Sequence, residues 1–226
     1  IWRAREGADD AIGRLLQHCR LVQCNTTITT VQVHSPGPTC QAVVALRDSE
    51  GGHYEFDQVI LAVQANQAVA MLGDQDPLAV DCLRAVAYQR SEVVVHGDPA
   101  LAPGHATTGP AVLFEVDRNR QAPMASICLN KLYPSLREAP PLFQTWNPLR
   151  EPAAGKVLGR AHFERPVLTT DSLARLAELD RLLDAEGRRV WYCGSYAKPG
   201  IPLLESALQS AMDIARRLGA DIPWSG

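Results

Sequence analysis

The spacing of hydrophobic positions changes several times along the 226 residues of the chain, and each change predicts a new element. Near the N-terminus, apolar residues at helical spacing follow Asp9 and Asp10, which predicts an amphipathic helix over residues 8–19. Short β-prone runs separated by turn sequences come next, at residues 21–22, 28–33, 42–46 and 59–63. The last of them lies in QVILAV, an apolar run without alternation, which is typical of a strand buried on both faces in a parallel sheet.

From residue 65 onward the pattern is typical of a second module. Helical spacing predicts two short helices, at residues 66–73 and 77–87. Alternation then predicts antiparallel strands with one solvated face, at residues 91–99, 111–116, 124–130, 143–146 and 159–165. A leucine stripe predicts a helix over residues 171–184, with Asp171 as its N-cap or first-turn acid. The chain then returns to a buried strand at residues 190–193 and a final helix over residues 203–218.

Composition is that of a folded globular protein, because 46% of the residues are hydrophobic and 21% are charged. The net charge of −3 gives no electrostatic reason to expect a nucleic acid or an anionic membrane as a partner. No apolar run reaches the ~18 residues of a transmembrane segment. The six cysteines form no CxxC pair and no metal-ligand spacing, so we expect reduced thiols in a cytoplasmic protein and no metal site.

The stretch VWYCGSYAKPGIPLLESALQSA, residues 190–211, runs from a strand through a Gly/Pro loop into a helix. Gly194 has no Cβ, so its backbone can approach a ligand closely. The N-terminus of the following helix carries a partial positive charge that suits phosphate. These features predict a site for a flat, phosphate-bearing cofactor. A connection that only reverses the chain direction explains the same residues, and both readings stay open on these grounds alone.

The same stretch resembles the C-terminal cofactor signature of the flavin-containing amine oxidoreductase superfamily. In that signature a strand ends in Gly and the next helix opens with an acid, a small residue and Ser-Gly. Glu205, Ala207 and Ser210 occupy those places. The sequence departs from the signature at Ser195, where the family often has an acid, and at Ala211, where it has Gly. The resemblance implies FAD as the cofactor, with the helix N-terminus toward its pyrophosphate and isoalloxazine.

Other segments resemble the same superfamily in the same order. REGADDAIGRLLQHC is similar to its glycine turn and following helix, VQCNTTITTVQV to its adenine-side strand, and FDQVILAVQANQAVAML to its return strand. LNKLYPSL and FQTWNPLREPAAGKVLGRAHFERPV resemble a bacterial subgroup of predicted NAD/FAD-binding proteins. The resemblance therefore implies the following cofactor-binding residues: Gly7, Ile28, Ala62, Val63, Gly194, Ser195, Gly200, Leu204 and Glu205.

The implied fold is mixed α/β (α+β): part of an FAD-binding doubly wound domain, with a substrate domain built on a mostly antiparallel sheet. Residues 1–66 and 186–226 are expected in the FAD domain and residues 67–185 in the substrate domain. No Gly-x-Gly triplet occurs, although the superfamily opens with GxGxxG. We therefore expect a fragment of a longer flavoprotein. A sheet without its first strands exposes apolar edges, which favours self-association or association with an N-terminal FAD-binding portion.

Catalytic candidates follow from the same resemblance. In amine oxidases a substrate-domain lysine holds a water near the flavin, but the comparable position here is Ser91 or Glu92, which argues against amine oxidation itself. The remaining candidates are Lys131, Tyr196 beside the flavin loop, and His96, whose side chain titrates near neutral pH. His96 also fits a hydrogen-bonded strand-end residue. Trp146 and Asn147 are further candidates for a pocket lining.

Two functions remain open on the sequence. The leading hypothesis is an amine-oxidase-like, FAD-dependent oxidoreductase that oxidises or desaturates an apolar or acyl small molecule. The apolar strands of the second module fit such a substrate, although any protein core needs similar residues. The alternative is a non-catalytic remnant or partner-binding module that keeps the fold without the cofactor, and it is motivated by the missing GxGxxG and by Ser195 and Ala211.

Overall fold

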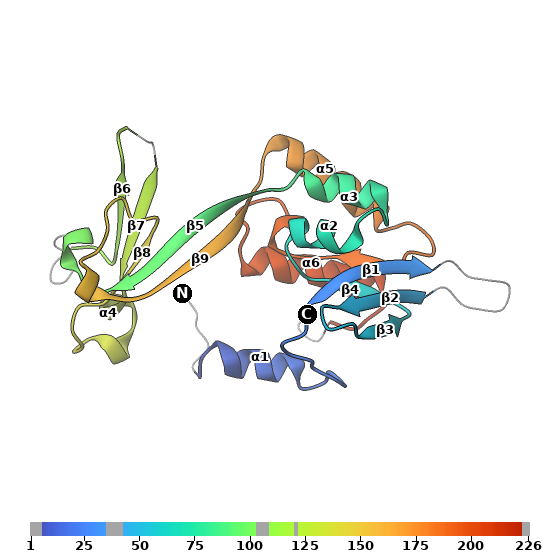
Figure 1. The fold of residues 1–226 in the computed structure, drawn as a ribbon, viewed down its shortest axis with the longest axis horizontal. Helices are drawn as coiled ribbons and strands as arrows, with labels where there is room; N and C mark the ends of the chain where they lie inside the picture. Colours follow the sequence, from blue (N-terminus) through green and yellow to red (C-terminus); the bar gives the residue numbers. More distant parts are fainter. Residues whose placement is uncertain (1–5, 35–42, 103–108, 120–121, 223–226) are drawn as a thin grey trace. The chain divides into compact units, whose positions relative to one another are not determined.

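The computed structural model describes residues 6–34, 43–102, 109–119 and 122–222. Contacts between residues divide the chain into two compact units. Figure 1 labels the helices and strands of both. The first unit holds the chain up to residue 84, residues 177–194 and the chain from residue 211. The second holds residues 85–176 and 195–210. No helix in the described ranges is long and apolar enough to cross a lipid bilayer.

The first unit begins with a helix and a three-stranded antiparallel sheet. The helix is α1 (Ala8–Leu16), and none of its residues is buried. The sheet has the order β1-β2-β3, with strands β1 (Ile28–His34), β2 (Val43–Asp48) and β3 (His53–Phe56). The Asp48 carboxylate shapes the β2–β3 turn, because it accepts hydrogen bonds from the Gly52 amide at 2.7 Å and the Tyr54 hydroxyl at 2.8 Å. The Tyr54 bond, followed by the backbone donors, lowers the pKa of Asp48.

A separate parallel pair forms the second sheet of this unit. Strands β4 (Val59–Leu61) and β10 (Val190–Tyr192) run side by side, with Tyr192 opposite Leu61. All three residues of β10 are buried, as the unpatterned apolar sequence predicts. Helices α2 (Ala65–Leu72) and α3 (Pro77–Arg84) follow β4 and bury apolar side chains of one face, among them Ala68, Leu72 and Leu83.

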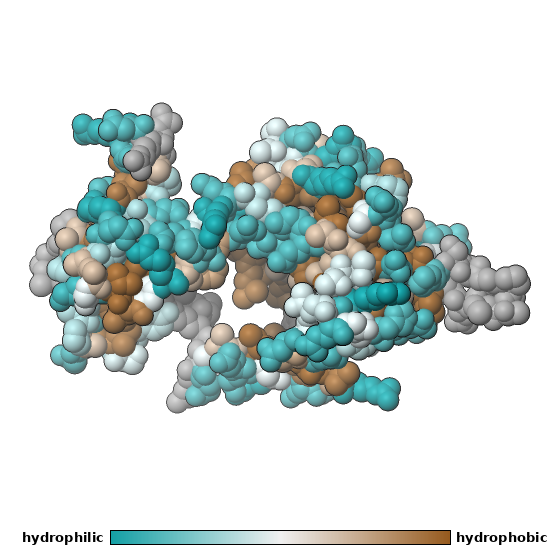
Figure 2. Space-filling model, viewed as in Figure 1, coloured by the Kyte–Doolittle hydropathy of each residue, from teal (hydrophilic) through white to brown (hydrophobic). Residues whose placement is uncertain are grey.

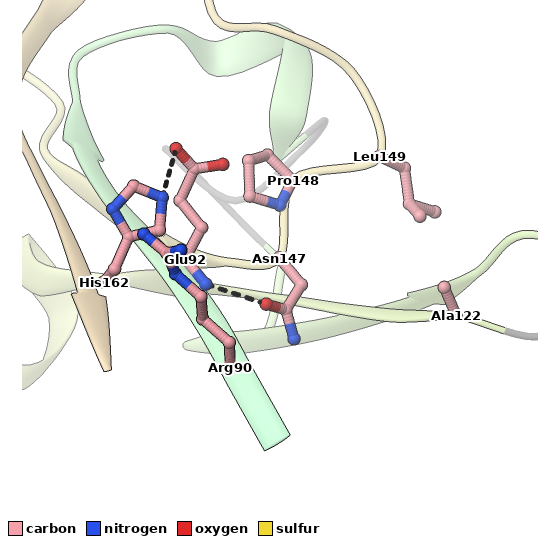
Figure 3. Close-up of a pocket in the computed structure, with 7 residues that line it drawn as sticks. All are labelled: Arg90, Glu92, Ala122, Asn147, Pro148, Leu149 and His162. Atoms are coloured by element: carbon pink, nitrogen blue, oxygen red, sulfur yellow. Dashed lines mark hydrogen bonds and ion pairs between the residues drawn. The ribbon is translucent and has the colours of Figure 1, made fainter. Parts of the chain in front are cut away.

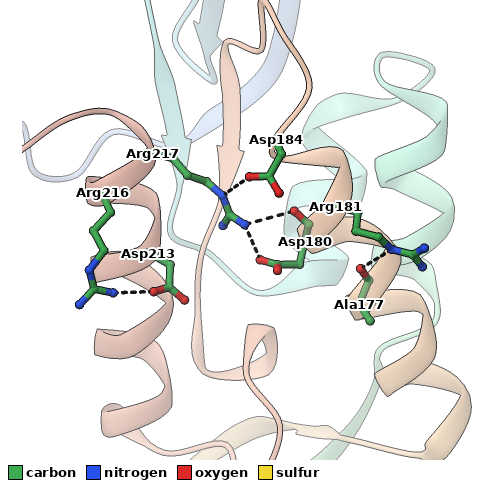
Figure 4. A network of polar contacts seen from close by, with 7 residues as sticks. All are labelled: Ala177, Asp180, Arg181, Asp184, Asp213, Arg216 and Arg217. Atoms are coloured by element: carbon green, nitrogen blue, oxygen red, sulfur yellow. Dashed lines mark hydrogen bonds and ion pairs between the residues drawn. The ribbon is translucent and has the colours of Figure 1, made fainter.

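Charged side chains tie these elements together. Asp76, just before α3, pairs with Arg188, just before β10, and accepts a hydrogen bond from the Tyr192 hydroxyl at 2.8 Å. Arg217, the last residue of α6 (Leu204–Arg217), forms ion pairs at the end of α5 (Thr170–Leu182). Its Nε donates to Asp184 at 2.8 Å and its Nη2 to Asp180 at 3.0 Å (Figure 4). Burial alone would lower the pKa of Arg217, but the two aspartates raise it.

The second unit is built on a five-stranded antiparallel sheet of order β6-β7-β8-β5-β9. Its strands are β5 (Ala87–His96), β6 (Val112–Val116), β7 (Pro123–Cys128), β8 (Phe143–Trp146) and β9 (Val157–Val167). Short helical turns lie in the connections between these strands: η1 (Pro99–Leu101), α4 (Leu129–Leu132), η2 (Pro134–Leu136) and η3 (Ala154–Lys156). A further turn, η4 (Ser195–Ala197), lies between β10 and α6. Phe143, Ala102 and Cys128 form a fully buried cluster on one face of this sheet.

The predicted fold class is confirmed: the chain is mixed α/β, and its sheets are mostly antiparallel. Several local expectations were wrong. Residues 21–22 form no strand, and β3 was not predicted because HYEF has no apolar run. α1 ends at Leu16 rather than at residue 19, and the helix predicted over residues 77–87 ends at Arg84, because residue 87 opens β5. The strand predicted over residues 42–46 begins at a residue that lies outside the described ranges. The cap of α5 is a reciprocal pair between Thr169 and Ser172, with Asp171 in the first turn. The assignment of residues 1–66, 67–185 and 186–226 to cofactor and substrate domains stays a prediction.

Candidate functional site

The carboxyl ends of the parallel strands β4 and β10 form the centre of the candidate site. The Cys193 amide donates to the Leu61 carbonyl at 3.2 Å, so the parallel pairing continues one residue past β10. This bond places Ala62 and Val63 beside Cys193 and Gly194. Ligands of α/β sheets commonly bind outside the carboxyl ends of parallel strands, so this edge is the candidate site.

The residues at this edge of the sheet have small side chains or none. Ala62 is exposed, whereas Val63, Gly194 and Ser195 are half-buried. Gly194 adds no Cβ at the point where β10 ends. Cys193 itself is buried, and burial raises the pKa of its thiol, which keeps the sulfur protonated and unsuited to act as a thiolate nucleophile.

The N-terminus of α2 is next to this edge but is already capped. The Gln64 and Gln67 side chains form a reciprocal capping box, and Asn66 Oδ1 accepts a hydrogen bond from the Gln67 amide at 2.9 Å. The first turn of α2 therefore has acceptors of its own. This helix start therefore has fewer free N–H donors for a phosphate than an uncapped helix start would have.

The loop before α6 holds the other predicted cofactor residues. Gly200 has φ 108° and lies in open space, where a side chain would be strained by the backbone alone. The Ser206 hydroxyl donates to the Ile201 carbonyl at 3.0 Å and so ties the loop to the first turn of α6. Leu204 is 85% exposed, and the Glu205 carboxylate accepts a hydrogen bond from Gln209 Nε2 at 2.9 Å.

The structure brings some of the predicted cofactor residues together. Ala62, Val63 and Gly194 meet at the ends of β4 and β10, and Ser195 follows directly in η4. The other predicted residues lie elsewhere in the described chain: Gly7 is the N-cap of α1 with φ 95°, Ile28 opens β1 opposite Asp48, and Gly200, Leu204 and Glu205 belong to the second unit. Their contact with a cofactor stays a prediction.

Two catalytic candidates, Lys131 and Tyr196, have contrasting environments. Lys131 is exposed in α4, and its Nζ donates to the Gly109 carbonyl. Tyr196 is buried in η4, directly after Ser195. Tyr196 is therefore the candidate closest in sequence to the ends of β4 and β10.

His96 lies in the interior of the second unit and is fully buried. Its Nδ1 accepts from the Asp98 amide at 3.1 Å, so Nε2 must carry the ring proton, which it donates to Thr145 Oγ1 at 2.8 Å. Thr145 then donates to Ser126 at 2.8 Å, and Ser126 donates to the Leu101 carbonyl at 3.1 Å. Burial lowers the pKa of His96, and the neighbouring Asp98 offsets part of this shift. Both ring nitrogens are thus occupied, which favours a structural role.

One face of the five-stranded sheet is apolar and partly open. Phe114 and Trp146 lie in the same cross-strand row, and Phe163 lies one row away on the same face. Phe114 is 72% exposed. The rings of Trp146 and Phe163 are 5.8 Å apart, and the Arg165 guanidinium lies 5.5 Å from the Trp146 ring.

The opposite face carries a polar pocket of about 520 Å³ (Figure 3). Arg90 and Glu92 from β5, His162 from β9, and the segment 147–149 after β8 line it together with Ala122. Sequence reasoning proposed Asn147 as a pocket residue but missed Arg90 and His162. Alternation in β5 and β9 puts both on one face, although only the register of the two strands shows that they meet.

Comparisons with known proteins show the fold. No protein-family model matches the sequence, and no curated protein matches it. Among solved structures, the chain is similar to a CLA-producing fatty acid isomerase from P. acnes, with a TM-score of 0.64, 12% identity, and coverage of 96% of this chain and 53% of that one. It is also similar to a proposed protoporphyrinogen oxidase from Exiguobacterium sp. 255-15, with a TM-score of 0.63, 14% identity and coverage of 94% and 51%.

A third similar structure is a reduced UDP-galactopyranose mutase, with a TM-score of 0.53, 14% identity, and coverage of 77% of this chain and 44% of that one. The chain thus spans about half the length of the solved proteins that it matches.

In the described part of the chain, no group of three or more His, Cys, Asp or Glu side chains is arranged to hold a metal ion.

Proposed function

We propose that the chain is part of an FAD-dependent oxidoreductase of the amine-oxidase-like kind. The observation that carries the proposal is the pair of parallel strands β4 and β10, which end side by side in the small residues Ala62 and Gly194. The resemblance of residues 190–211 to the flavin signature supplies the identity of the cofactor. The similarity of the fold to an isomerase, a proposed oxidase and a mutase in its reduced state agrees with this assignment.

The residues at this edge fit a flat ring system. Ala62, Val63, Gly194 and Ser195 present backbone and small side chains, so these residues would hold the flavin. Bound FAD supplies the capacity to take up or give back a pair of electrons as the substrate reacts. The resemblance to the flavin signature also assigns Gly200, Leu204 and Glu205 to the cofactor, and Ser206 holds their loop to the first turn of α6.

The chain's own side chains would orient the substrate and exclude water. The apolar face with Phe114, Trp146 and Phe163 suits an apolar or acyl substrate, because burying such a chain contributes roughly 25 cal/mol per Å². Tyr196, buried beside Ser195, is the residue that we assign to the flavin's neighbourhood. Lys131 is retained as a candidate at the substrate, whereas the bonds of His96 favour a positioning role for it within the sheet.

FAD binding of this kind also needs a glycine-rich dinucleotide unit, which we expect outside these 226 residues. This chain contains no Gly-x-Gly triplet to carry the pyrophosphate turn. Such a unit could come from a preceding part of the same protein or from a partner. The protein for the test is therefore the chain with its natural flanking sequence.

The test is a titration of that protein with FAD, followed by flavin fluorescence and the visible spectrum. We expect Ala62→Phe to weaken FAD binding at least about tenfold, because a large side chain fills the sheet edge. Ala70→Phe is the matched control, since Ala70 is an exposed position on α2, and it should bind FAD as the wild type does. A protein that binds no FAD would support the non-catalytic alternative, and equal effects of both substitutions would contradict the assigned edge.

A further inference from the structure

The polar pocket of the second unit has features of a binding site, and none of its residues belongs to the proposed cofactor site. Glu92 of β5 lies directly opposite His162 of β9, and their side chains approach within 3.8 Å. Arg90 lies on the same face as Glu92, two residues earlier in β5. Asn147, Pro148 and Leu149 form the facing wall (Figure 3).

The negative charge of Glu92 is already balanced. Arg160, which occupies the next same-face position on β9, pairs with the Glu92 carboxylate through Nη1. The other end of the Arg160 guanidinium, Nη2, bonds to Glu151 at 2.6 Å. Arg160 therefore balances the charge of Glu92, so Glu92 does not depend on Arg90, the only arginine or lysine of β5. Glu164 of β9 lies directly opposite Arg90 and is a second carboxylate on the same face.

Two groups of donors at the pocket have no acceptor in the described chain. The Arg90 guanidinium makes no hydrogen bond or ion pair with a described residue, and no described residue accepts from Asn147 Nδ2. Asn147 is held rigidly, because its amide donates to the Glu92 carbonyl at 2.8 Å and its Oδ1 accepts from the Glu92 amide at 3.0 Å. Oδ1 is therefore engaged with β5, and the Nδ2 donors are directed elsewhere.

The backbone at Asn147 has an unusual conformation that fixes this wall of the pocket. Asn147 has φ 48°, a left-handed conformation that asparagine tolerates better than most residues. The segment is fixed further by the Leu149 amide, which contacts Met124 Sδ at 3.5 Å. The side-chain amide of Asn147 is thus held in a fixed orientation next to the apolar surfaces of Pro148 and Leu149.

We propose that this pocket binds a small monocarboxylate with a short apolar stem. The carboxylate accepts from the Arg90 guanidinium and from Asn147 Nδ2, and the stem lies against Pro148 and Leu149. A guanidinium fork matches the planar geometry of a carboxylate. A phosphate dianion fits less well, because its extra charge lies near the Glu92 carboxylate.

The test is a titration of the isotope-labelled full chain with sodium butyrate, followed by the NMR signals of the Asn147 side-chain amide and the Arg90 guanidinium. We expect saturable shifts of both signals in the millimolar range, and weaker binding of inorganic phosphate. Arg90→Gln should weaken butyrate binding at least about tenfold, and Arg90→Lys should weaken it less, because the charge remains but the fork is lost. Arg90 is exposed and unbonded, so both variants should keep the wild-type fold.

Arg137→Gln is the matched control, because Arg137 is an exposed arginine in the same unit that does not line the pocket. It should bind butyrate with wild-type affinity. The proposal is overturned if butyrate shifts neither signal, if phosphate binds more tightly than butyrate, or if Arg137→Gln weakens binding as much as Arg90→Gln. FAD binding at Ala62 is scored separately, so a failure here leaves the proposed cofactor site untouched.

Discussion

His96 shows how the surroundings decide the chemistry of a single side chain. Its residue type and its place at the end of a strand make it a candidate acid or base in the sequence. In the fold, its ring lies 5.6 Å from that of Phe143 and both of its nitrogens are bonded. The proton on Nε2 completes a chain of hydrogen bonds through Thr145 and Ser126. A second proton on Nδ1 would face the Asp98 amide, which is itself a donor.

We predict that acid destabilises the protein through His96. The pKa of the folded-state ring is lowered from 6.5, so below that pH the unfolded chain binds a proton that the folded chain excludes. Unfolding free energy should fall by up to about 1.4 kcal/mol per pH unit below about pH 6.5, until the folded-state pKa is reached. Urea unfolding of wild type and His96→Gln, at pH values on either side of 6.5, measures the difference.

His34→Gln is the control for this prediction, because His34 is exposed at the end of β1. This variant should keep the wild-type pH dependence, whereas His96→Gln should lose part of it. The same pH dependence in wild type and His96→Gln would show that the buried ring does not set the acid response.

At the scale of elements, most helices and strands could be predicted because each has a clear period. The alternating runs became β5 to β9, and the leucine stripe became α5. β3 was missed, since its sequence has no apolar run and its pairing with β2 depends on the Asp48 turn. The pairing of β4 with β10 could also be predicted from the sequence, because two apolar strands without alternation are typical of a parallel pair.

The pocket could not be predicted from local pattern. Arg90 and His162 meet only through the register of β5 and β9. The orientation of Asn147 depends on a left-handed backbone position and on two bonds to Glu92. Such long-range register is fixed by tertiary packing rather than by the period of either strand.

The closure of α6 on α5 gives a prediction for stability. Arg217 is 20% exposed and bonds to both Asp180 and Asp184, whereas its neighbour Arg216 is 54% exposed and pairs with Asp213 (Figure 4). We expect Arg217→Ala to reduce unfolding free energy by about 1–2 kcal/mol and Arg216→Ala by less than about 0.5 kcal/mol. Urea unfolding measures both losses of free energy, and ~1 M salt should reduce the difference between the two variants, because salt screens ion pairs. Equal losses at both positions would contradict this role of Arg217.

At the scale of the whole molecule, both units leave apolar side chains on the surface (Figure 2). Ile60 in the short β4–β10 pair is 47% exposed, and Leu158 on the edge strand β9 is 72% exposed. Exposed edges of this kind favour pairing with a further strand or chain. We therefore propose that these edges associate with an N-terminal FAD-binding portion or with a second copy of the chain. The cytoplasmic location is a separate proposal.

Amide hydrogen exchange of the protein with and without FAD tests most directly whether the cofactor binds at the ends of β4 and β10. FAD should slow exchange at least about tenfold at residues 61–64 and 193–196, where these two strands end. Residues 43–48 of β2 should exchange at the same rate in both samples. Unchanged exchange at both strand ends, in a sample shown to have bound FAD, would contradict the assignment of the cofactor to this edge.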